Sequence, residues 1–525
     1  MERKYKSGCT DAMRATAWSL GVFCLLVILG VFWLRASGSW NYISVLVATI
    51  PVAVIAVFAH FYGLLENETL IFRAYALILS YFCLVFVFII PPMSSPDEGH
   101  HFFSSYWISD VVTGDATLQD GGSFPVREDV VEMYNGSSMA IGSSGYRRVF
   151  DSFGLFADSD EVVQVNQFDF SFGSENVAAK IPSVVGILIA RGLNLGAYPL
   201  FYLGRLLAAL FFVCCVLLAV HITPTAKAAF MGISLLPMSL QLAGSYSYDC
   251  GIIALCFLLS AVLLRSIFSN EEIGLRQAVT LFALVFLVAP LKIVYLSVLL
   301  LLLFIPQRRF CSRKYAFIFK LVVVISAIAS IASVRLASIS SLVGSGAVDS
   351  LDYRGTETGK FYSLNDLLSD PLGTAALFVR TFDVMGDFYI ESMVGALPGW
   401  LQANLRAPNL LIYAYLGCLL LCVQKTQFDN QSISLGVRVA MTAACFLTFL
   451  GVSLSMAVGW TFNTEGVIQG VQGRYFLPMA PMALLALRSR DIEVQKSPYD
   501  ICVVTLTFLN VIYLLRFTSI AFSLP

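Results

Sequence analysis

The chain has 525 residues, of which 58% are hydrophobic and 13% are charged, and its formal net charge is −1. A soluble globular domain is usually about 45–50% apolar and about 25% charged. This composition therefore excludes an ordinary soluble protein and indicates a polytopic membrane protein. The near-neutral charge gives no reason to expect a nucleic acid partner.

Apolar stretches recur along the chain and predict an all-α integral membrane protein, a helical bundle of about 11–13 spans. Two regions are ambiguous. The region 277–306 holds two short spans separated at Pro290, and 181–196 fits either a surface helix or a re-entrant one. The expected spans lie near 15–34, 42–64, 69–91, 197–220, 226–244, 249–268, 277–290, 291–306, 314–337, 409–424, 436–458, 474–488 and 500–521.

The distribution of lysine and arginine sets the expected orientation, because cytoplasmic segments carry an excess of these residues. The N-terminus is basic, and the apolar run at 15–34 is about 20 residues long, which favours a retained first helix over a cleaved signal peptide. Crossing from a cytoplasmic N-terminus places 92–180, 338–408 and 459–473 outside. Basic residues then mark the cytoplasmic ends: Arg265, Arg276, Arg308, Arg309, Arg313, Lys314, Lys425, Arg438, Arg488, Arg490 and Lys496.

We expect one membrane domain, without a separate soluble domain or a visible internal repeat. Its outer segments are long, and the first shows little periodicity, which is uncommon in a loop without a function. The second holds an amphipathic piece at 372–405 that fits a helix along the membrane interface. No cysteine lies in either segment, so no disulfide framework is expected there. The predicted organisation is membrane helices at 1–91, 181–337 and 409–525, with outer loops at 92–180 and 338–408.

The most informative short motif is Pro96-Asp97-Glu98-Gly99-His100-His101-Phe102, a few residues after the third expected span. Ionisable groups are expensive at membrane depth, so a cluster there marks a candidate functional site. A solvated loop start is the ordinary alternative. Asp97 and Glu98 are the candidate catalytic residues, because a carboxylate can accept the proton of an attacking hydroxyl group.

Further polar side chains fall at the same predicted height near the outer surface. A departing phosphate needs a cation, and Arg474, Lys292 and Arg205 are the candidates. Each has a structural alternative: contact with lipid headgroups for Arg474, anchoring of a helix end for Lys292, and pairing with Asp249 or another carboxylate for Arg205. The candidate substrate-binding set is His101, Arg205, Tyr248, Asp249, Lys292, Tyr295, Gln472, Arg474 and Tyr475.

A metal site at His100 and His101 is disfavoured. Adjacent histidines point in different directions, and the sequence has neither an HExxH motif nor a third histidine at metal-ligand spacing. We therefore expect no cofactor, with a divalent cation as the less favoured alternative, and we expect His101 to orient a carboxylate or to meet a phosphate. The pair in Asp158-Ser159-Asp160 is interpreted as ordinary surface.

Four short motifs occur in order along the chain: Pro96-Asp97-Glu98-x-x-His101-Phe102, Pro237-Met238-Ser239-Leu240-Gln241 with Ser245-Tyr246-Ser247-Tyr248-Asp249, Lys292-Ile293-Val294-Tyr295, and Gly470-Val471-Gln472-Gly473-Arg474-Tyr475-Phe476-Leu477-Pro478. Together they resemble the signatures of a bacterial family of predicted membrane proteins, domain of unknown function family 2142. The resemblance extends over roughly 75–490.

That family resembles the GT-C glycosyltransferases, multi-span enzymes that take a sugar from a polyprenyl-phosphate carrier on the outer face. The resemblance implies a catalytic role for Asp97 or Glu98 and a phosphate-binding role for Arg474. The family also shows a GWLD stretch, but Gly399-Trp400-Leu401 is followed here by Gln402. An acid is therefore missing at that position.

The resulting hypothesis is a GT-C-type hexosyltransferase, expected to be inverting, in the bacterial cytoplasmic (inner) membrane with its active site outside. Its expected partners are a polyprenyl-phosphate-linked sugar donor, a surface glycan acceptor such as O-antigen or wall polysaccharide, and membrane lipid. A polysaccharide polymerase or ligase and a lipid-linked sugar transporter or flippase are the alternatives. The enzyme hypothesis requires Asp97, Glu98 and Arg474 to share one pocket.

Overall fold

The computed structural model describes residues 68–117, 123–168, 170, 175–344, 352–426, 429, 431–494 and 501–525. The spans expected near 15–34 and 42–64 lie outside these ranges. Within them, six helices are long and apolar enough to cross a membrane. They are α3 (Glu68–Ile89), α8 (Ala197–Ile222), α11 (Asp249–Phe268), α13 (Arg313–Gly344), α18 (Leu435–Trp460) and α21 (Leu506–Ala521).

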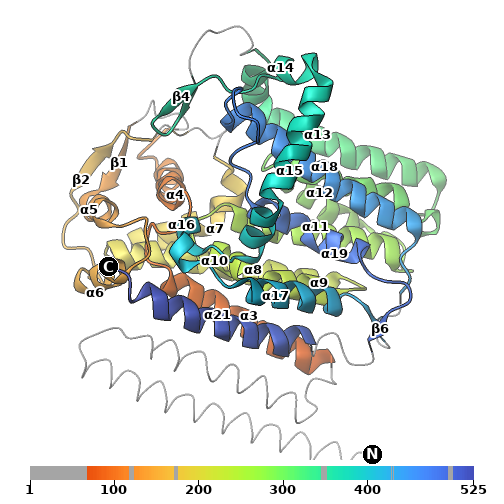
Figure 1. Ribbon diagram of the computed structural model, residues 1–525, viewed down its shortest axis with the longest axis horizontal. Coiled ribbons are helices and arrows are strands. Elements are labelled where there is room, and N and C mark those ends of the chain that lie inside the picture. Colours follow the sequence, from red (N-terminus) through yellow and green to blue (C-terminus); the bar gives the residue numbers. More distant parts are fainter. Residues whose placement is uncertain are drawn as a thin grey trace, which may run out of the picture.

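The spanning helices run roughly alongside one another across Figure 1, with α8 packed against both α3 and α11. Helix α11 is the most enclosed of the six, since 89% of its most apolar stretch is buried inside the protein. Long apolar helices, with only two-stranded pairs of short strands in the described residues, make this a polytopic all-α membrane protein. The predicted fold class is confirmed.

Three further apolar helices are shorter than these six: α12 (Leu275–Val288), η2 (Ile293–Phe304) and α17 (Asn409–Cys422). The second of these is a 3₁₀ helix of 12 residues, packed against α18. Runs of 3₁₀ helix longer than three or four residues are uncommon. The chain therefore forms the tighter 3₁₀ helix at Ile293–Phe304, where the apolar run alone predicted an ordinary α-helical span.

Two predicted spans are not continuous helices. The stretch 226–244 divides into α9 (Lys227–Ser234) and α10 (Pro237–Ala243), because Pro237 lacks the N–H group that would continue the first helix. The stretch 474–488 begins as the 3₁₀ helix η5 (Gly473–Met479) and continues as α19 (Ala480–Ala486). The ambiguous region at 181–196 is mostly α7 (Val177–Gly192), which packs along α8.

The segment 92–180 folds into a lobe, which we call the first lobe. It contains α4 (Glu98–Thr113), α5 (Glu128–Gly136), α6 (Ser143–Asp151) and the antiparallel pair β1 (Phe124–Arg127) and β2 (Val162–Val165). Its buried centre is aromatic, with Phe103, Trp107, Phe124 and Phe170 in mutual ring contacts. Periodicity did not predict β1, β2, α5 and α6, because these elements are only four to nine residues long.

A second lobe is built from 352–405. Its elements are β3 (Asp352–Arg354), β4 (Glu357–Gly359), α14 (Leu364–Ser369), α15 (Pro371–Val394), α16 (Pro398–Leu401) and the 3₁₀ turn η4 (Ala403–Leu405). Helix α15 lies within the stretch 372–405 expected to hold an amphipathic helix and packs against η5, with Leu377 and Tyr389 buried and the apolar Val379 and Phe382 exposed.

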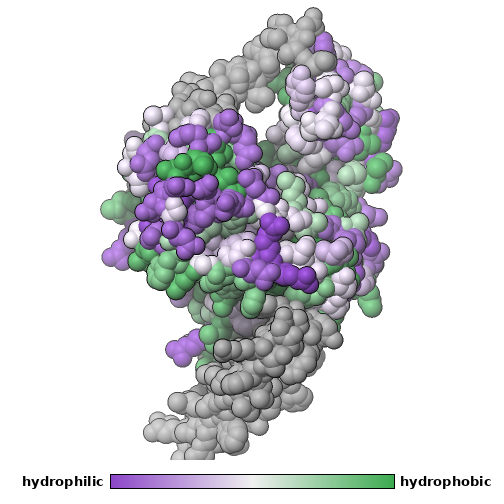
Figure 2. Space-filling view, turned by 90° about the vertical axis from the view of Figure 1, so that its left-hand side faces the viewer, coloured by the Kyte–Doolittle hydropathy of each residue, from purple (hydrophilic) through white to green (hydrophobic). Residues whose placement is uncertain are grey.

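The first lobe lies at the opposite end of the spans from the short pair of β5 (Lys425–Thr426) and β6 (Glu493–Val494) (Figure 1). The remaining short elements are η3 (Gln307–Arg309) and the π-helical turn η6 (Ile501–Thr505). Figure 2 looks onto the end that carries the first lobe and shows hydrophilic side chains gathered around a hydrophobic patch. This polar end fits an aqueous surface.

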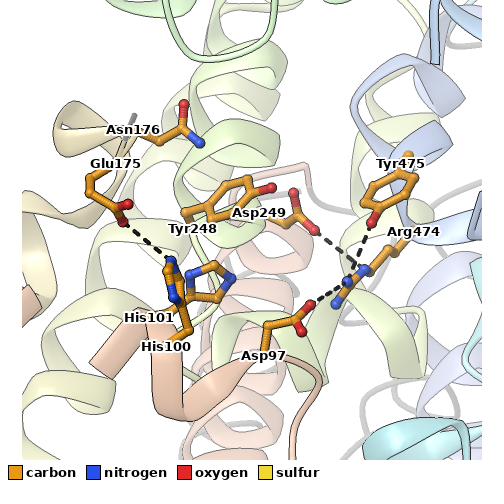
Figure 3. Close-up of a pocket in the computed structure, with 9 residues that line it drawn as sticks. All are labelled: Asp97, His100, His101, Glu175, Asn176, Tyr248, Asp249, Arg474 and Tyr475. Carbon is orange, nitrogen blue, oxygen red and sulfur yellow. Dashed lines mark hydrogen bonds and ion pairs between the residues drawn. The ribbon is translucent and has the colours of Figure 1, made fainter. Parts of the chain in front are cut away.

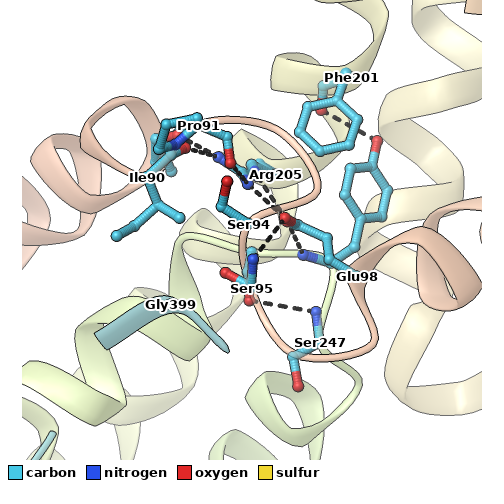
Figure 4. A network of polar contacts seen from close by, with 12 residues as sticks. Ile90, Pro91, Ser94, Ser95, Glu98, Phe201, Arg205, Ser247 and Gly399 are labelled. Carbon is cyan, nitrogen blue, oxygen red and sulfur yellow. Dashed lines mark hydrogen bonds and ion pairs between the residues drawn. The ribbon is translucent and has the colours of Figure 1, made fainter. Parts of the chain in front are cut away.

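A buried ion pair joins the lobe to the spans (Figure 4). Glu98 and Arg205 are both 0% exposed, with Arg205 Nη2 2.7 Å from Glu98 Oε2 and Nε 2.8 Å from Oε1. The guanidinium also donates to the carbonyl oxygens of Val87 (2.8 Å), Ile90 (2.6 Å) and Pro91 (3.2 Å). All five of its N–H groups thus have an acceptor, and three carbonyls in and just after the last turn of α3 are satisfied.

The Glu98 carboxylate accepts two further hydrogen bonds, from the backbone N–H groups of Tyr246 (3.1 Å) and Ser95 (3.4 Å). The pair therefore fixes four segments to one another: the end of α3, the start of α4, helix α8 and the turn before α11.

We predict that Arg205→Met destabilises the protein by about 3–5 kcal/mol, because it leaves the Glu98 carboxylate buried without its cation. Thermal unfolding of the purified protein in detergent measures the loss. Arg265→Met is the matched control, since Arg265 pairs with Glu271 at a surface where the two side chains are 42% and 72% exposed. Equal unfolding temperatures for the two variants would contradict the structural role of Glu98–Arg205.

Candidate functional site

One polar cavity of about 410 Å³ opens where the first lobe meets the spans (Figure 3). It brings together four segments that are far apart in the sequence. Its lining residues are Asp97, His100, His101, Glu175, Asn176, Tyr248, Asp249, Arg474 and Tyr475.

Three α-helices begin at this cavity. Asp97 is the N-cap residue of α4, Asn176 that of α7 and Tyr248 that of α11, and none of these side chains caps its own helix. The first N–H groups of a helix carry a partial positive charge, so a helix N-terminus favours a nearby anion. The convergence of three such ends makes the cavity electrostatically suited to a negatively charged group.

Asp97 stands at the edge of the cavity in a left-handed backbone conformation, with φ 57° and ψ 15°. This conformation is uncommon for a residue other than glycine, although aspartate adopts it more readily than most. Its side chain is 53% exposed, whereas the adjacent Glu98 side chain is fully buried. The turn therefore directs two consecutive carboxylates to different environments.

Arg474 is the cation nearest to Asp97. Its side chain is only 5% exposed, yet its contacts are long: Nη2 lies 3.4 Å from Asp97 Oδ2, and Nε lies 3.5 Å from Asp249 Oδ2. Its hydrogen bond to the Tyr475 hydroxyl is 3.5 Å long. Charge-assisted hydrogen bonds are normally about 2.7–2.9 Å long. The guanidinium is therefore buried but loosely held beside an open space.

Lys292 and Tyr295 support this end of the cavity from behind, without lining it. Lys292 Nζ lies 3.0 Å from Asp249 Oδ1 and sits 4.9 Å and 4.3 Å from the ring centres of Tyr248 and Tyr475. The Tyr295 hydroxyl donates to the carbonyl oxygen of Tyr475 at 2.9 Å. Asp249 is thereby shared by Lys292 and Arg474, and Lys292 helps to hold the rings of the lining residues Tyr248 and Tyr475 in place.

The opposite wall contains residues that the sequence analysis did not assign. Glu175 Oε2 lies 2.6 Å from Lys180 Nζ, accepts from the Ser104 hydroxyl at 2.6 Å, and lies 3.6 Å from His100 Nε2. Burial raises the pKa of Glu175, but His100 and Lys180 outweigh it and hold that pKa well below its usual range. The carboxylate is therefore ionised and neutralised by Lys180. A lone lysine early in the apolar helix at 177–192 was the signal that a buried partner existed.

His101 lines the same wall with its ring edge-on to Tyr248, the ring centres 4.7 Å apart. Burial lowers the pKa of His101 well below its usual value, and Lys180, His100 and Arg474 lower it further. The imidazole is therefore neutral at pH 7. Within the described part of the chain, its Nδ1 has no hydrogen-bond partner although it is buried.

Five of the residues proposed from the sequence do not line the cavity: Glu98, Arg205, Lys292, Tyr295 and Gln472. Glu98 is the main correction. The sequence offered it as a base equal to Asp97, but it is inaccessible and fully engaged by Arg205. The structural alternative stated for Arg205 is the one observed, with Glu98 as its partner in place of Asp249. Gln472 directly precedes η5 and keeps a buried Oε1 without a partner among the described residues.

The described residues hold no group of three or more His, Cys, Asp or Glu side chains arranged to bind a metal ion. Asp158 and Asp160 are exposed in the first lobe, away from the residues that line the cavity.

A family model described as predicted membrane protein (DUF2142) matches residues 164–483, more than half of the chain. The match includes Glu175, Asp249 and Arg474 but begins after the motif at Pro96–Phe102, so it is shorter than the resemblance seen in the sequence. No curated protein and no solved structure matches the chain. The chain belongs to the predicted membrane protein family DUF2142.

Proposed function

We propose that this protein is a GT-C-type glycosyltransferase of the bacterial cytoplasmic membrane. It transfers a hexose from a polyprenyl-phosphate carrier to a surface glycan, such as O-antigen or a wall polysaccharide, on the outer face. One observation carries the proposal: the half-exposed Asp97 carboxylate and the buried, loosely paired Arg474 guanidinium lie 3.4 Å apart in one polar cavity.

Asp97 is the proposed general base. A hydroxyl group of the acceptor attacks the anomeric carbon of the donor sugar, and the bond between that carbon and the phosphate oxygen breaks. The hydroxyl proton passes to the Asp97 carboxylate, and the carrier leaves as polyprenyl phosphate. A single displacement of this kind inverts the anomeric configuration.

Arg474 is the proposed partner of the phosphate. A buried guanidinium with contacts of 3.4–3.5 Å gains most from a new anion at its open side. The N-termini of α4, α7 and α11 add partial positive charge in the same space. Binding of the phosphate to Arg474 also draws this cation away from Asp97, which leaves the carboxylate better able to accept a proton. No resident cofactor takes part in the proposed reaction.

We predict that Asp97→Asn lowers sugar transfer by at least about 100-fold, because an amide cannot accept the hydroxyl proton. The measurement is the monosaccharide composition of the surface glycan, by mass spectrometry, in cells whose only copy of the protein is the variant. Asp115→Asn is the matched control. Asp115 lies in the first lobe, pairs with Arg191 of α7 and has a side chain that is 52% exposed, close to the 53% of Asp97. An unchanged glycan in cells that express folded Asp97→Asn would overturn the mechanism.

We predict that Arg474→Gln weakens binding of polyprenyl phosphate by about 10- to 100-fold, since a charge-assisted hydrogen bond to the phosphate is lost. Arg474→Lys keeps the charge and should lose less. Native mass spectrometry of the full chain with polyprenyl phosphate measures the dissociation constants. Arg380→Gln, an exposed arginine of α15, should bind like the wild type. Equal affinity of Arg474→Gln and Arg380→Gln would refute the phosphate site.

A further inference from the structure

The wall opposite Arg474 carries the hydrogen-bonding side chains of His101 and Asn176 (Figure 3). His101 is only 7% exposed, lines the cavity, and has a buried Nδ1 without a partner among the described residues. A neutral imidazole nitrogen is a donor in one tautomer and an acceptor in the other. A hydroxyl group can serve as either partner, so it completes this site whichever tautomer is present.

Asn176 offers a donor of fixed orientation in the same cavity. Its side-chain Oδ1 accepts a hydrogen bond from Arg335 Nη2, which assigns the oxygen to that side of the amide. The amide nitrogen is then on the side of Tyr248, as Figure 3 shows. The backbone of Asn176 is left-handed, with φ 51°, which holds the side chain at the start of α7.

The charges on this wall cancel, because the Glu175 carboxylate is paired with the Lys180 ammonium group. The Glu175 carboxylate is occupied by Lys180 and Ser104 at 2.6 Å each, and Lys180 is only 2% exposed. An amino group on a ligand would find this acid already neutralised. A carboxylate on a ligand would face the ionised Glu175, whose cation Lys180 is already paired with it.

We infer that His101, Asn176 and Tyr248 form a subsite for the hydroxyl groups of an uncharged hexose, separate from the phosphate subsite at Arg474. This inference rests on the proposed function and makes it more specific: the donor carries a neutral sugar rather than a uronic acid or an amino sugar. His101 and Asn176 bind the sugar ring directly, while Glu175 and Lys180 hold the wall in position.

Binding to the full chain in nanodiscs tests the inference with defined probes. The reference probe is polyprenyl methyl phosphate, a monoanionic diester without a sugar. The others are polyprenyl-phosphate glucose, mannose and galactose, with the glucuronic acid and glucosamine derivatives as charged comparisons. We expect at least one neutral hexose to bind more tightly than the reference, and both charged sugars to bind more weakly than that hexose.

Variants of His101 assign the effect to the subsite. His101→Phe keeps the ring packing on Tyr248 but removes both nitrogens, so affinity for the preferred hexose carrier should fall by about three- to tenfold while the reference is unchanged. His101→Asn returns a polar atom near Nδ1 and should recover part of the loss. His221→Phe is the control, because that histidine lies at the far end of α8 beside Phe72.

Asn176→Gly is a second, independent variant, because glycine adopts the left-handed backbone without strain. It should also weaken binding of the hexose carrier alone. If His101→Phe weakens the reference as much as the hexose carrier, or if a charged sugar binds most tightly, the subsite is refuted. The proposed function is then still decided by whether Asp97→Asn loses sugar transfer, whereas wild-type protein that binds no carrier at all would refute both.

Discussion

The ion pair between Glu98 and Arg205 is the constraint on which the rest of the site depends. Two charges at 0% exposure are costly unless every hydrogen-bonding group is satisfied. Here the guanidinium donates to carbonyl oxygens in and just after the last turn of α3, and each carboxylate oxygen accepts a hydrogen bond from a backbone N–H group. The start of α4 is therefore fixed relative to the membrane helices, and with it the position of Asp97.

Asp97, the residue before Glu98, is exposed to the cavity where Glu98 is buried, and the difference comes from the backbone conformation of Asp97. If Asp97 were helical, it would follow the α4 spiral, but its left-handed conformation places it outside the helix as the N-cap residue. The strain of that conformation is modest for aspartate. Glu98 anchors the motif through its buried pair with Arg205, and the motif thereby holds the Asp97 carboxylate beside Arg474 while leaving that carboxylate exposed.

The sequence predicted the helical membrane architecture and the association of Asp97 with Asp249 and Arg474, because span counting placed all three at one predicted height. It could not separate Asp97 from Glu98, since adjacent residues share the same pattern and only the backbone angle distinguishes them. It also missed Glu175, which lies in an irregular segment and becomes informative only once Lys180 packs beside it. Reading hydrophobicity alone made both stretches look like continuous spans: the break at 237 had a visible signal in Pro237, whereas the 3₁₀ start at Gly473 had none, because hydrophobicity does not reveal helix type.

The helix break at Gly473 matters because it places a helix start, not a helix middle, at the cavity. A continuous span at 474–488 would present Arg474 on an ordinary helix face, whereas η5 begins at Gly473, where a β-carbon would lie 1.9 Å from the carbonyl oxygen of Tyr389. That close approach to α15 sets the position of the guanidinium. The starts of α4, α7 and α11 surround the same space, so their N–H groups supply positive potential without adding a further ionised side chain. A cavity assembled in this way can favour an anion at one end while the Glu175–Lys180 pair keeps the other end neutral.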